Sequence, residues 1–113
     1  AVGLNFIDVY HRTGLYPLSM PATIGMEAAG VVEAVGDNVH RFSVGDEVYA
    51  EVDAGSFAEY TVARAKCLAH KPSRISFGEA AAVPIAATTA LQGCGMSRRS
   101  SRACGSSTPR VAS

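Results

Sequence analysis

The segment GMEAAGVVEAVG at 25–36 combines three glycines, two glutamates and a methionine, and these residue types could serve a phosphate loop, a metal site or a bend in a strand. A phosphate loop needs GxGxxG between a strand and a helix, or GxxxxGK[ST]. The glycines here are spaced five and six residues apart, and Val31 and Val32 stand where the second motif needs lysine and serine or threonine. Neither phosphate motif is present.

A metal site would need histidine, cysteine or carboxylate side chains at ligand spacing. The three histidines, His11, His40 and His70, are far apart in the sequence, and no cysteine cluster accompanies them. The residues alone therefore favour a barrel strand, with glycines where the backbone bends or approaches another segment closely.

Short strands separated by turn signals make up most of the chain. Strands are expected in three segments, 27–36, 41–52 and, as a pair, 55–72. Valine-rich or alternating patterns occupy these segments, with Gly-Asp turn signals between them. In the pair, we expect Phe57, Tyr60 and Val62 to share a buried side. Strands at intervals of about 8 to 12 residues indicate an all-β barrel or sandwich rather than a βαβ layer.

The segments before and after these strands differ in character. The opening AVGLNFIDVY, residues 1–10, is apolar from its first residue and is predicted to be a strand or core segment. Residues 11–25 contain two prolines and two glycines, which favours a surface loop. After the strands, Ser76 and Glu79 form a capping-box pattern that predicts a helix start. Pro84 predicts a break, so we expect two short helices rather than one.

Charge is unevenly distributed along the chain. The formal net charge is zero, which gives no reason to expect nucleic acid or an anionic membrane as a partner. Residues 1–93 carry six basic and ten acidic side chains, a balance of −4, whereas residues 94–113 carry four arginines and no acid, a balance of +4. The Ser/Arg-rich segment 94–113 lacks apolar periodicity and is expected to be disordered. It could be a basic linker or tail, an alternative exon, or an out-of-frame translation.

Length and cysteine usage set further bounds. At 113 residues the chain is sized for one domain. Cys67, Cys94 and Cys104 form no CxxC pair and leave one cysteine over in any pairing, which fits a reducing compartment and makes the cytoplasm the default. No apolar run approaches the roughly 20 residues of a membrane span, and the first residues lack a basic n-region. Neither a span nor a signal peptide is predicted.

Three stretches carry a resemblance when taken together. They are GLNFIDVYHRTGLYP, IGMEAAGVVEAVGDNVHRFSVGDEVY and GSFAEYTV. In this order and spacing they resemble the GroES-like catalytic barrel of the medium-chain dehydrogenases/reductases, and within that superfamily the zinc-free quinone oxidoreductase, or zeta-crystallin-like, branch. The likeness covers about residues 1–92. It implies a mainly β fold, an incomplete GroES-like barrel with short helices over 1–93, whose first strands and following Rossmann domain are absent from this sequence.

The resemblance also bears on metal binding. Zinc-dependent relatives carry a cysteine at the position of Asn5, in a C-x-x-D pattern that here ends at Asp8, and GHE where this chain has Gly25, Met26 and Glu27. An amide and a thioether are poor ligands for Zn²⁺. The resemblance therefore implies a cleft without metal ligands, in which Asp8 and Glu27 support neighbouring side chains.

Four residues form the site that the resemblance implies. Asn5 would position the nicotinamide ring through its amide, and Thr89 would face that ring, with Thr88 as the register alternative. Tyr10 and Tyr16 would supply flat faces and a hydroxyl donor to a quinone oxygen, because hydride delivery builds negative charge there. The alternatives are half-buried packing for the tyrosines, and local backbone hydrogen bonds for Asn5 and the threonine.

The activity implied is that of an NADPH-dependent quinone oxidoreductase acting on a quinone or another conjugated carbonyl. Enoyl reduction within the same superfamily is one alternative, and a non-catalytic product, either crystallin-like and structural or truncated, is another. The pyrophosphate and ribose contacts of such enzymes lie on the Rossmann domain. We therefore expect this chain alone to bind NADPH weakly or not at all and to turn over little, and its oligomeric state is left open.

Overall fold

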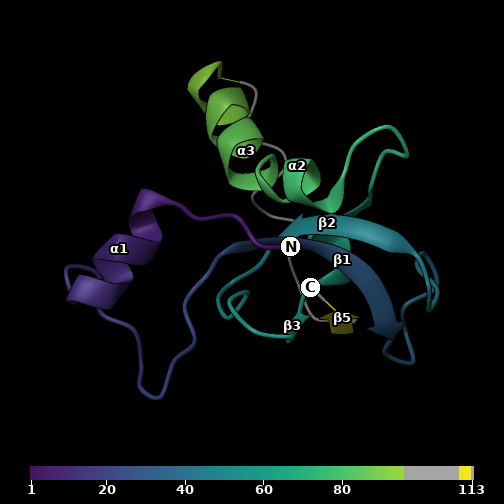
Figure 1. Cartoon of the computed structure of the whole chain (residues 1–113), viewed down its shortest axis with the longest axis horizontal. Helices are drawn as coiled ribbons and strands as arrows, with labels where there is room; N and C mark the ends of the chain where they lie inside the picture. Colours follow the sequence, from purple (N-terminus) through teal and green to yellow (C-terminus); the bar gives the residue numbers. More distant parts are fainter. Residues whose placement is uncertain (96–109, 113) are drawn as a thin grey trace.

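The computed structural model of the chain describes residues 1–95 and 110–112. Three helices occupy α1 (Phe6–Thr13), α2 (Phe77–Ala81) and α3 (Pro84–Gly93), and a 3₁₀ turn, η1, spans Ala65–Cys67. The strands are β1 (Glu27–Ala34), β2 (Glu47–Glu51), β3 (Tyr60–Val62), β4 (Leu68–His70) and β5 (Arg110–Ala112). Figure 1 shows β1 and β2 at the centre, α2 and α3 above them, and α1 standing to one side.

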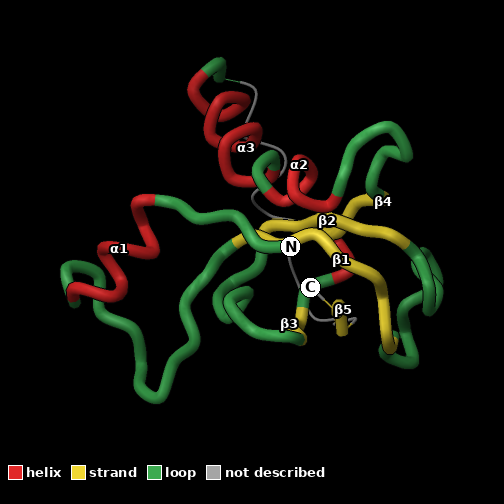
Figure 2. The backbone as a smooth tube through the Cα atoms, in the orientation of Figure 1, coloured by secondary structure: helices red, strands yellow, loops and turns green. Residues whose placement is uncertain are grey.

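The described strands form one antiparallel sheet in the order β3-β5-β1-β2-β4. The two longest strands, β1 and β2, pair with Glu27 opposite Glu51 and Gly30 opposite Val48, and both curve strongly (Figure 2). The mainly β class with a few short helices is confirmed. The described strands make an incomplete GroES-like sheet and do not close into a barrel.

The two faces of the sheet bury different sets of side chains. Successive side chains in a strand point to opposite faces. On one face Val48, Ala50 and Val52 join the main core around Phe42 and Leu68, which confirms the alternation expected for the second strand segment.

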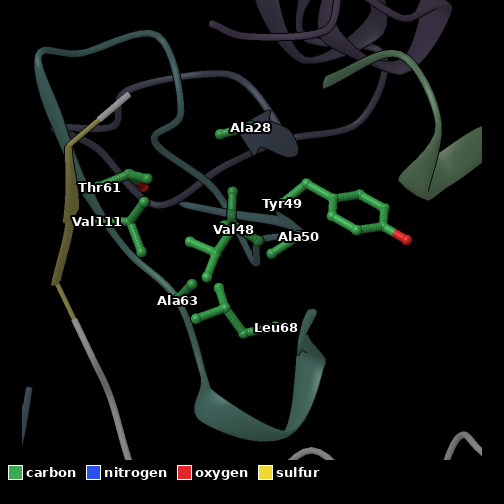
Figure 3. A pocket seen from close by; sticks show the side chains of 9 residues that line it. Ala28, Val48, Tyr49, Ala50, Thr61, Ala63, Leu68 and Val111 are labelled. Atoms are coloured by element: carbon green, nitrogen blue, oxygen red, sulfur yellow. The ribbon is translucent and has the colours of Figure 1, made fainter. Parts of the chain in front are cut away.

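Tyr49 faces the other way. In Figure 3 its ring turns away from the cluster formed by Val48, Leu68, Ala63 and Val111. On that second face Tyr49 packs with Ala29, under α2, so α2 and α3 lie on the face that also carries Glu27 and Glu51.

The predicted burial in the third strand segment is wrong by one position. Tyr60 and Val62 are 43% and 56% exposed, whereas Thr61 and Ala63 are buried. A shift of one residue moves every side chain of a strand to the opposite face. Thr61 lies opposite Val111, and the positions facing the core hold the smaller side chains. Hydrophobicity alone favoured the larger ones.

The predicted strand or core segment at 1–10 holds for residues 1–3, which pair with the start of β1, and is wrong from Phe6 onward. Val2 makes one isolated bridge to Ala28, and from Phe6 the chain forms α1, where Phe6 is 81% exposed. Asn5 and Asp8 start this helix through a capping box. Gly14 ends it at φ +80°, a conformation that glycine adopts readily. Residues 14–26 then form a loop, so the predicted loop at 11–25 is correct except that residues 11–13 belong to α1.

Both helix predictions near the end of the domain are confirmed. Ser76 is the N-cap of α2, and its hydroxyl oxygen accepts from the backbone N–H of Glu79 at 3.2 Å. Pro84 is the first residue of α3, so the chain breaks into two short helices. Among the described residues, no helix combines the length and apolar character that crossing a membrane requires.

The N-cap of α2 should contribute stability in a pH-dependent way. The backbone N–H and then the hydroxyl of Ser76 donate to Glu79, which lowers the pKa of that carboxyl. Because the folded pKa lies below the unfolded one, the contribution is present above about pH 4.5 and is lost as pH falls through the folded pKa. Ser76→Ala should lower the free energy of unfolding by about 1 kcal/mol at neutral pH.

Urea unfolding at neutral and acidic pH tests this cap. We expect the difference between wild type and Ser76→Ala to shrink in acid, and Glu79→Gln to remove that dependence. Ser73→Ala, in the exposed turn before the helix, is the matched control and should change little. A Ser76→Ala effect of the same size at every pH would contradict the role assigned to Glu79.

The expectation of disorder at 94–113 falls largely on residues 96–109 and 113, which lie outside the described residues. Cys94 and Gly95 form the turn that closes α3. At Arg110–Ala112 the structure differs from the expectation, because these residues form β5 between β1 and β3. Val111 is buried in the main core. The composition of segment 94–113 did not predict this contact. The origin of 94–113 stays open.

Candidate active site

Glu27 lies at the centre of the polar cluster on the helix-covered face of the sheet. It is the first residue of β1 and only 2% exposed. Its Oε1 accepts from Nδ2 of Asn5 at 2.7 Å, and its Oε2 accepts from the backbone N–H of Ile85 at 3.0 Å. One carboxylate therefore connects the segment before α1, the start of β1 and the first turn of α3.

The backbone before α1 approaches Glu27 closely at Gly3. The N–H of Gly3 donates to the backbone oxygen of Glu27 at 3.3 Å. A Cβ on Gly3 would lie 2.6 Å from the carbonyl oxygen of Ala81 and closer still to Oε1 of Glu27. Only a residue without a side chain fits there, and this close approach brings Asn5 within reach of the carboxylate.

Asn5 is fixed by its backbone as well as by its side chain. Its backbone N–H donates to Oδ2 of the buried Asp8 at 2.8 Å. The amide nitrogen of Asn5 donates to a carboxylate, and the Asn5 side chain also faces the backbone of Asp8 in the capping box, so the predicted alternative, a local contact with backbone, exists beside the bond to Glu27. Asp8 and Glu27 thus both hold Asn5, as the resemblance implied for these two acids.

The structure brings Tyr10 and Tyr16 together. Their ring centroids are 5.7 Å apart at an interplanar angle of 81°, an edge-to-face pair. Tyr10 lies on α1 and Tyr16 on the loop that follows, and they are 38% and 53% exposed. Both belong to the part of the chain that stands away from the sheet in Figure 1. Aromatic faces and two phenol groups are therefore accessible beside the segment that carries Asn5.

A groove of about 510 Å³ lies between α3 and the face of the sheet formed by β2 and β4. Its lining includes Met26, Glu51, Val83, Thr88 and Leu91. Thr88 is half-buried and lines the groove, whereas the predicted Thr89 is exposed and is not part of the lining. The structure thus places the register alternative, Thr88, at the groove.

Glu51 was missed by sequence reasoning as a residue of this groove. It is the last residue of β2, opposite Glu27. Burial, and then the charges of Glu27 and Asp53, raise the pKa of the Glu51 carboxyl. The alternating pattern of the two strands was visible in the sequence, but the register that sets two glutamates side by side was not.

Glu51→Gln should stabilise the protein at neutral pH. A folded pKa above the unfolded value means that ionised Glu51 opposes folding at high pH, and that the penalty disappears as pH falls below about 4.5. We therefore expect a higher Tm for Glu51→Gln at neutral pH and equal Tm values in acid, measured by circular dichroism. Asp37→Asn removes an exposed turn charge and should leave Tm almost unchanged. A Tm that is lowered at neutral pH would contradict the prediction.

The donor set of this cluster consists of an amide, a thioether and carboxylates. In the described part of the chain, no group of three or more His, Cys, Asp or Glu side chains is arranged to hold a metal ion. Thr88 offers a hydroxyl to the groove, whereas Asn5, Tyr10 and Tyr16 are not among its lining residues.

The curved antiparallel sheet, the glutamate that opens β1 and the two helices above it define an incomplete GroES-like domain. Residues 1–73 match the alcohol dehydrogenase GroES-like domain family, and the chain belongs to that family.

Among curated proteins, the chain is 50% identical to the quinone oxidoreductase of Pseudomonas aeruginosa over 91 residues, covering 79% of this chain and 28% of that protein. It is 39% identical over 105 residues to the 2-methylene-furan-3-one reductase of Solanum lycopersicum, covering 82% and 27%. The crystal structure of Escherichia coli quinone oxidoreductase complexed with NADPH superposes with a TM-score of 0.77 at 37% identity, covering 87% and 30%.

These comparisons confirm the resemblance to the quinone oxidoreductase branch of the medium-chain dehydrogenases/reductases. The chain spans less than a third of the length of these relatives.

Proposed function

We propose that this chain carries the nicotinamide-facing and substrate-facing part of an NADPH-dependent quinone oxidoreductase. The observation that carries the proposal is the Asn5 amide, held by Glu27, whose neighbour in the chain, Met26, lines the groove together with Thr88. The Escherichia coli relative complexed with NADPH supports the choice of cofactor. The substrate class is a quinone or another conjugated carbonyl, and the cytoplasm stays the predicted location.

NADPH, when bound, supplies a hydride to the substrate. Asn5 would hold the carboxamide of the nicotinamide, and Thr88 would line the groove beside the ring. No GxGxxG segment for the pyrophosphate occurs in these 113 residues. We therefore expect weak or no binding of NADPH by the chain on its own, and little or no turnover.

Tyr10 and Tyr16 are the hydroxyl donors of the proposed reaction. A carbonyl oxygen gains negative charge during reduction, and a preorganised phenol can stabilise that charge. Asn5 and Met26 stand where zinc-dependent relatives have ligands, and their amide and thioether groups suit Zn²⁺ poorly. Activation of the carbonyl therefore falls to the phenols. Their edge-to-face ring pair also offers a flat face to a quinone.

A second candidate is the reduction of an activated carbon–carbon double bond. It is favoured by the similarity to the tomato reductase named above. A substrate panel separates the two, because quinones and enones place the hydride acceptor differently. A non-catalytic role, as a structural or truncated product, would be favoured if the coding sequence across Gly93–Ser113 truly ended this polypeptide without a downstream dinucleotide-binding segment.

A chimera tests the proposed function. Residues 1–92 of this chain would replace the matching segment of the Pseudomonas aeruginosa enzyme, and loss of NADPH absorbance would be followed with a quinone and with an enone. We expect quinone-dependent oxidation by the chimera and none by the 113-residue chain. A folded chimera without activity would contradict the proposed function, and turnover by the isolated chain would contradict its expected dependence on a second domain.

A further inference from the structure

We infer that Glu27 is a positioning residue that holds the Asn5 amide in one orientation and ties it to the first turn of α3. The amide nitrogen faces the carboxylate and the amide oxygen faces away from it. This inference deepens the proposed function, on which it rests for the identity of the ligand. The contacts that carry it lie wholly within this chain.

The orientation follows from hydrogen-bond chemistry. An ionised carboxylate only accepts hydrogen bonds, whereas an amide side chain donates from its nitrogen and accepts at its oxygen. The 2.7 Å distance from Nδ2 of Asn5 to Oε1 of Glu27 is that of a charge-assisted bond. A flipped amide would set two oxygens against each other, so Glu27 selects one of the two orientations.

The second oxygen of Glu27 connects this amide to α3. Pro84, the first residue of α3, has no N–H, so the N–H of Ile85 is the first donor of that helix. It donates to Oε2 of Glu27 at 3.0 Å, and a negative charge is favourable at a helix N-terminus. Because both oxygens are engaged, one carboxylate sets the spacing between Asn5 and the helix that carries Thr88.

Burial makes this arrangement hard to replace. Glu27 is almost fully buried, and Gly3 packs against its carboxylate so closely that no side chain fits between them. Removing one partner of a buried charged hydrogen bond leaves the other unsatisfied. We expect no neighbouring side chain to take over the two bonds.

The fixed orientation restricts what Asn5 can recognise. Its oxygen has two lone pairs, so one remains for a ligand even where the other helps to cap α1. A group that meets this oxygen must bring an N–H or O–H. The carboxamide NH₂ of a nicotinamide meets that requirement and a developing oxyanion does not, so Asn5 holds the cofactor ring and charge stabilisation is left to the tyrosines.

Nuclear magnetic resonance on the isotope-labelled 113-residue chain tests the contacts directly. A long-range HNCO experiment detects couplings across hydrogen bonds. We expect the side-chain nitrogen of Asn5 and the backbone nitrogen of Ile85 to correlate with the same Cδ, that of Glu27. If neither correlation appears in wild type while backbone hydrogen bonds of β1 and β2 are detected, the inference is overturned.

Glu27→Gln and Glu51→Gln form a matched pair, because they make the same change at opposed positions of β1 and β2. In Glu27→Gln an NH₂ group replaces one carboxylate oxygen. This group would face a donor, either Nδ2 of Asn5 or the backbone N–H of Ile85. We expect the exchange of the Ile85 amide hydrogen, or of the Asn5 side-chain hydrogens, to accelerate about tenfold or more. Glu51→Gln should accelerate neither exchange.

Equal rates of hydrogen exchange in Glu27→Gln and wild type would overturn the inference. If Glu27→Gln does not fold, the couplings measured in wild type alone test the inference. NADPH added to the chimera described above separates the inference from the proposed function. A shift of the Asn5 side-chain resonances in the chimera supports both. Intact couplings to Glu27 in the 113-residue chain without any NADPH-induced shift in the chimera would support the positioning role and contradict the cofactor role of Asn5.

Discussion

Gly25→Ala is expected to lower the free energy of unfolding by about 3 kcal/mol or more. Gly25 has φ +104°, a conformation that alanine adopts only under strain. A Cβ there would lie 2.8 Å from the backbone nitrogen of Phe57 and closer still to Oγ of the buried Ser56. The N–H of Ser56 donates to the oxygen of Gly25 at 3.2 Å, so the two segments cannot separate without losing that bond.

Gly45→Ala is the matched control for this effect. Gly45 has φ +97°, and no atom lies within 4 Å of the position that its Cβ would take. The control should therefore carry the backbone cost alone, about 1 to 2 kcal/mol. Urea unfolding of both variants gives the comparison. Equal losses would show that close packing against Ser56 contributes nothing beyond the backbone conformation.

The substitution at Gly25 should also affect the candidate site. Gly25 directly precedes Met26 and Glu27, so its contact with Ser56 helps to set where β1 begins. A side chain at Gly25 would displace the start of the strand. We expect the hydrogen bond between Glu27 and Asn5 to weaken in any folded fraction of Gly25→Ala.

Tyr10→Phe is expected to lower kcat of the chimeric quinone oxidoreductase by about 10²- to 10³-fold, the loss typical of one oxyanion donor. The change keeps the ring and removes only the hydroxyl. Tyr10 lies on α1, and Asn5 is the N-cap of that helix, so the helix backbone links Tyr10 to the amide that is proposed to hold the cofactor. Tyr16 lies on the following loop, and Tyr16→Phe should have the smaller effect.

Steady-state kinetics with NADPH and a quinone checks the roles of the two phenols. Tyr60→Phe, on the exposed side of β3, is the control and should leave kcat within about twofold of the parent. A double variant, Tyr10→Phe with Tyr16→Phe, should be the slowest. If it keeps the parental kcat, neither phenol is the donor and the proposed carbonyl activation is wrong.

The features of this fold that depend on neighbouring residues were predictable from the sequence. The strand around Val48, Ala50 and Val52, the cap at Ser76 and the break at Pro84 each follow from side chains a few positions apart. The motif spacing around Asn5 and Met26 likewise identified the family, because it depends on residue types in order. The site residues Asn5, Tyr10 and Tyr16 came from that resemblance and keep the standing of proposals.

What the tertiary structure alone decided depends on contacts between distant segments. The choice of Thr61 over Tyr60 for the core depends on strand register, which an alternating pattern leaves ambiguous by one residue. The bond between Glu27 and Ile85 joins residues 58 positions apart. No local pattern encodes such a pairing, because it arises only when the first turn of α3 meets the start of β1.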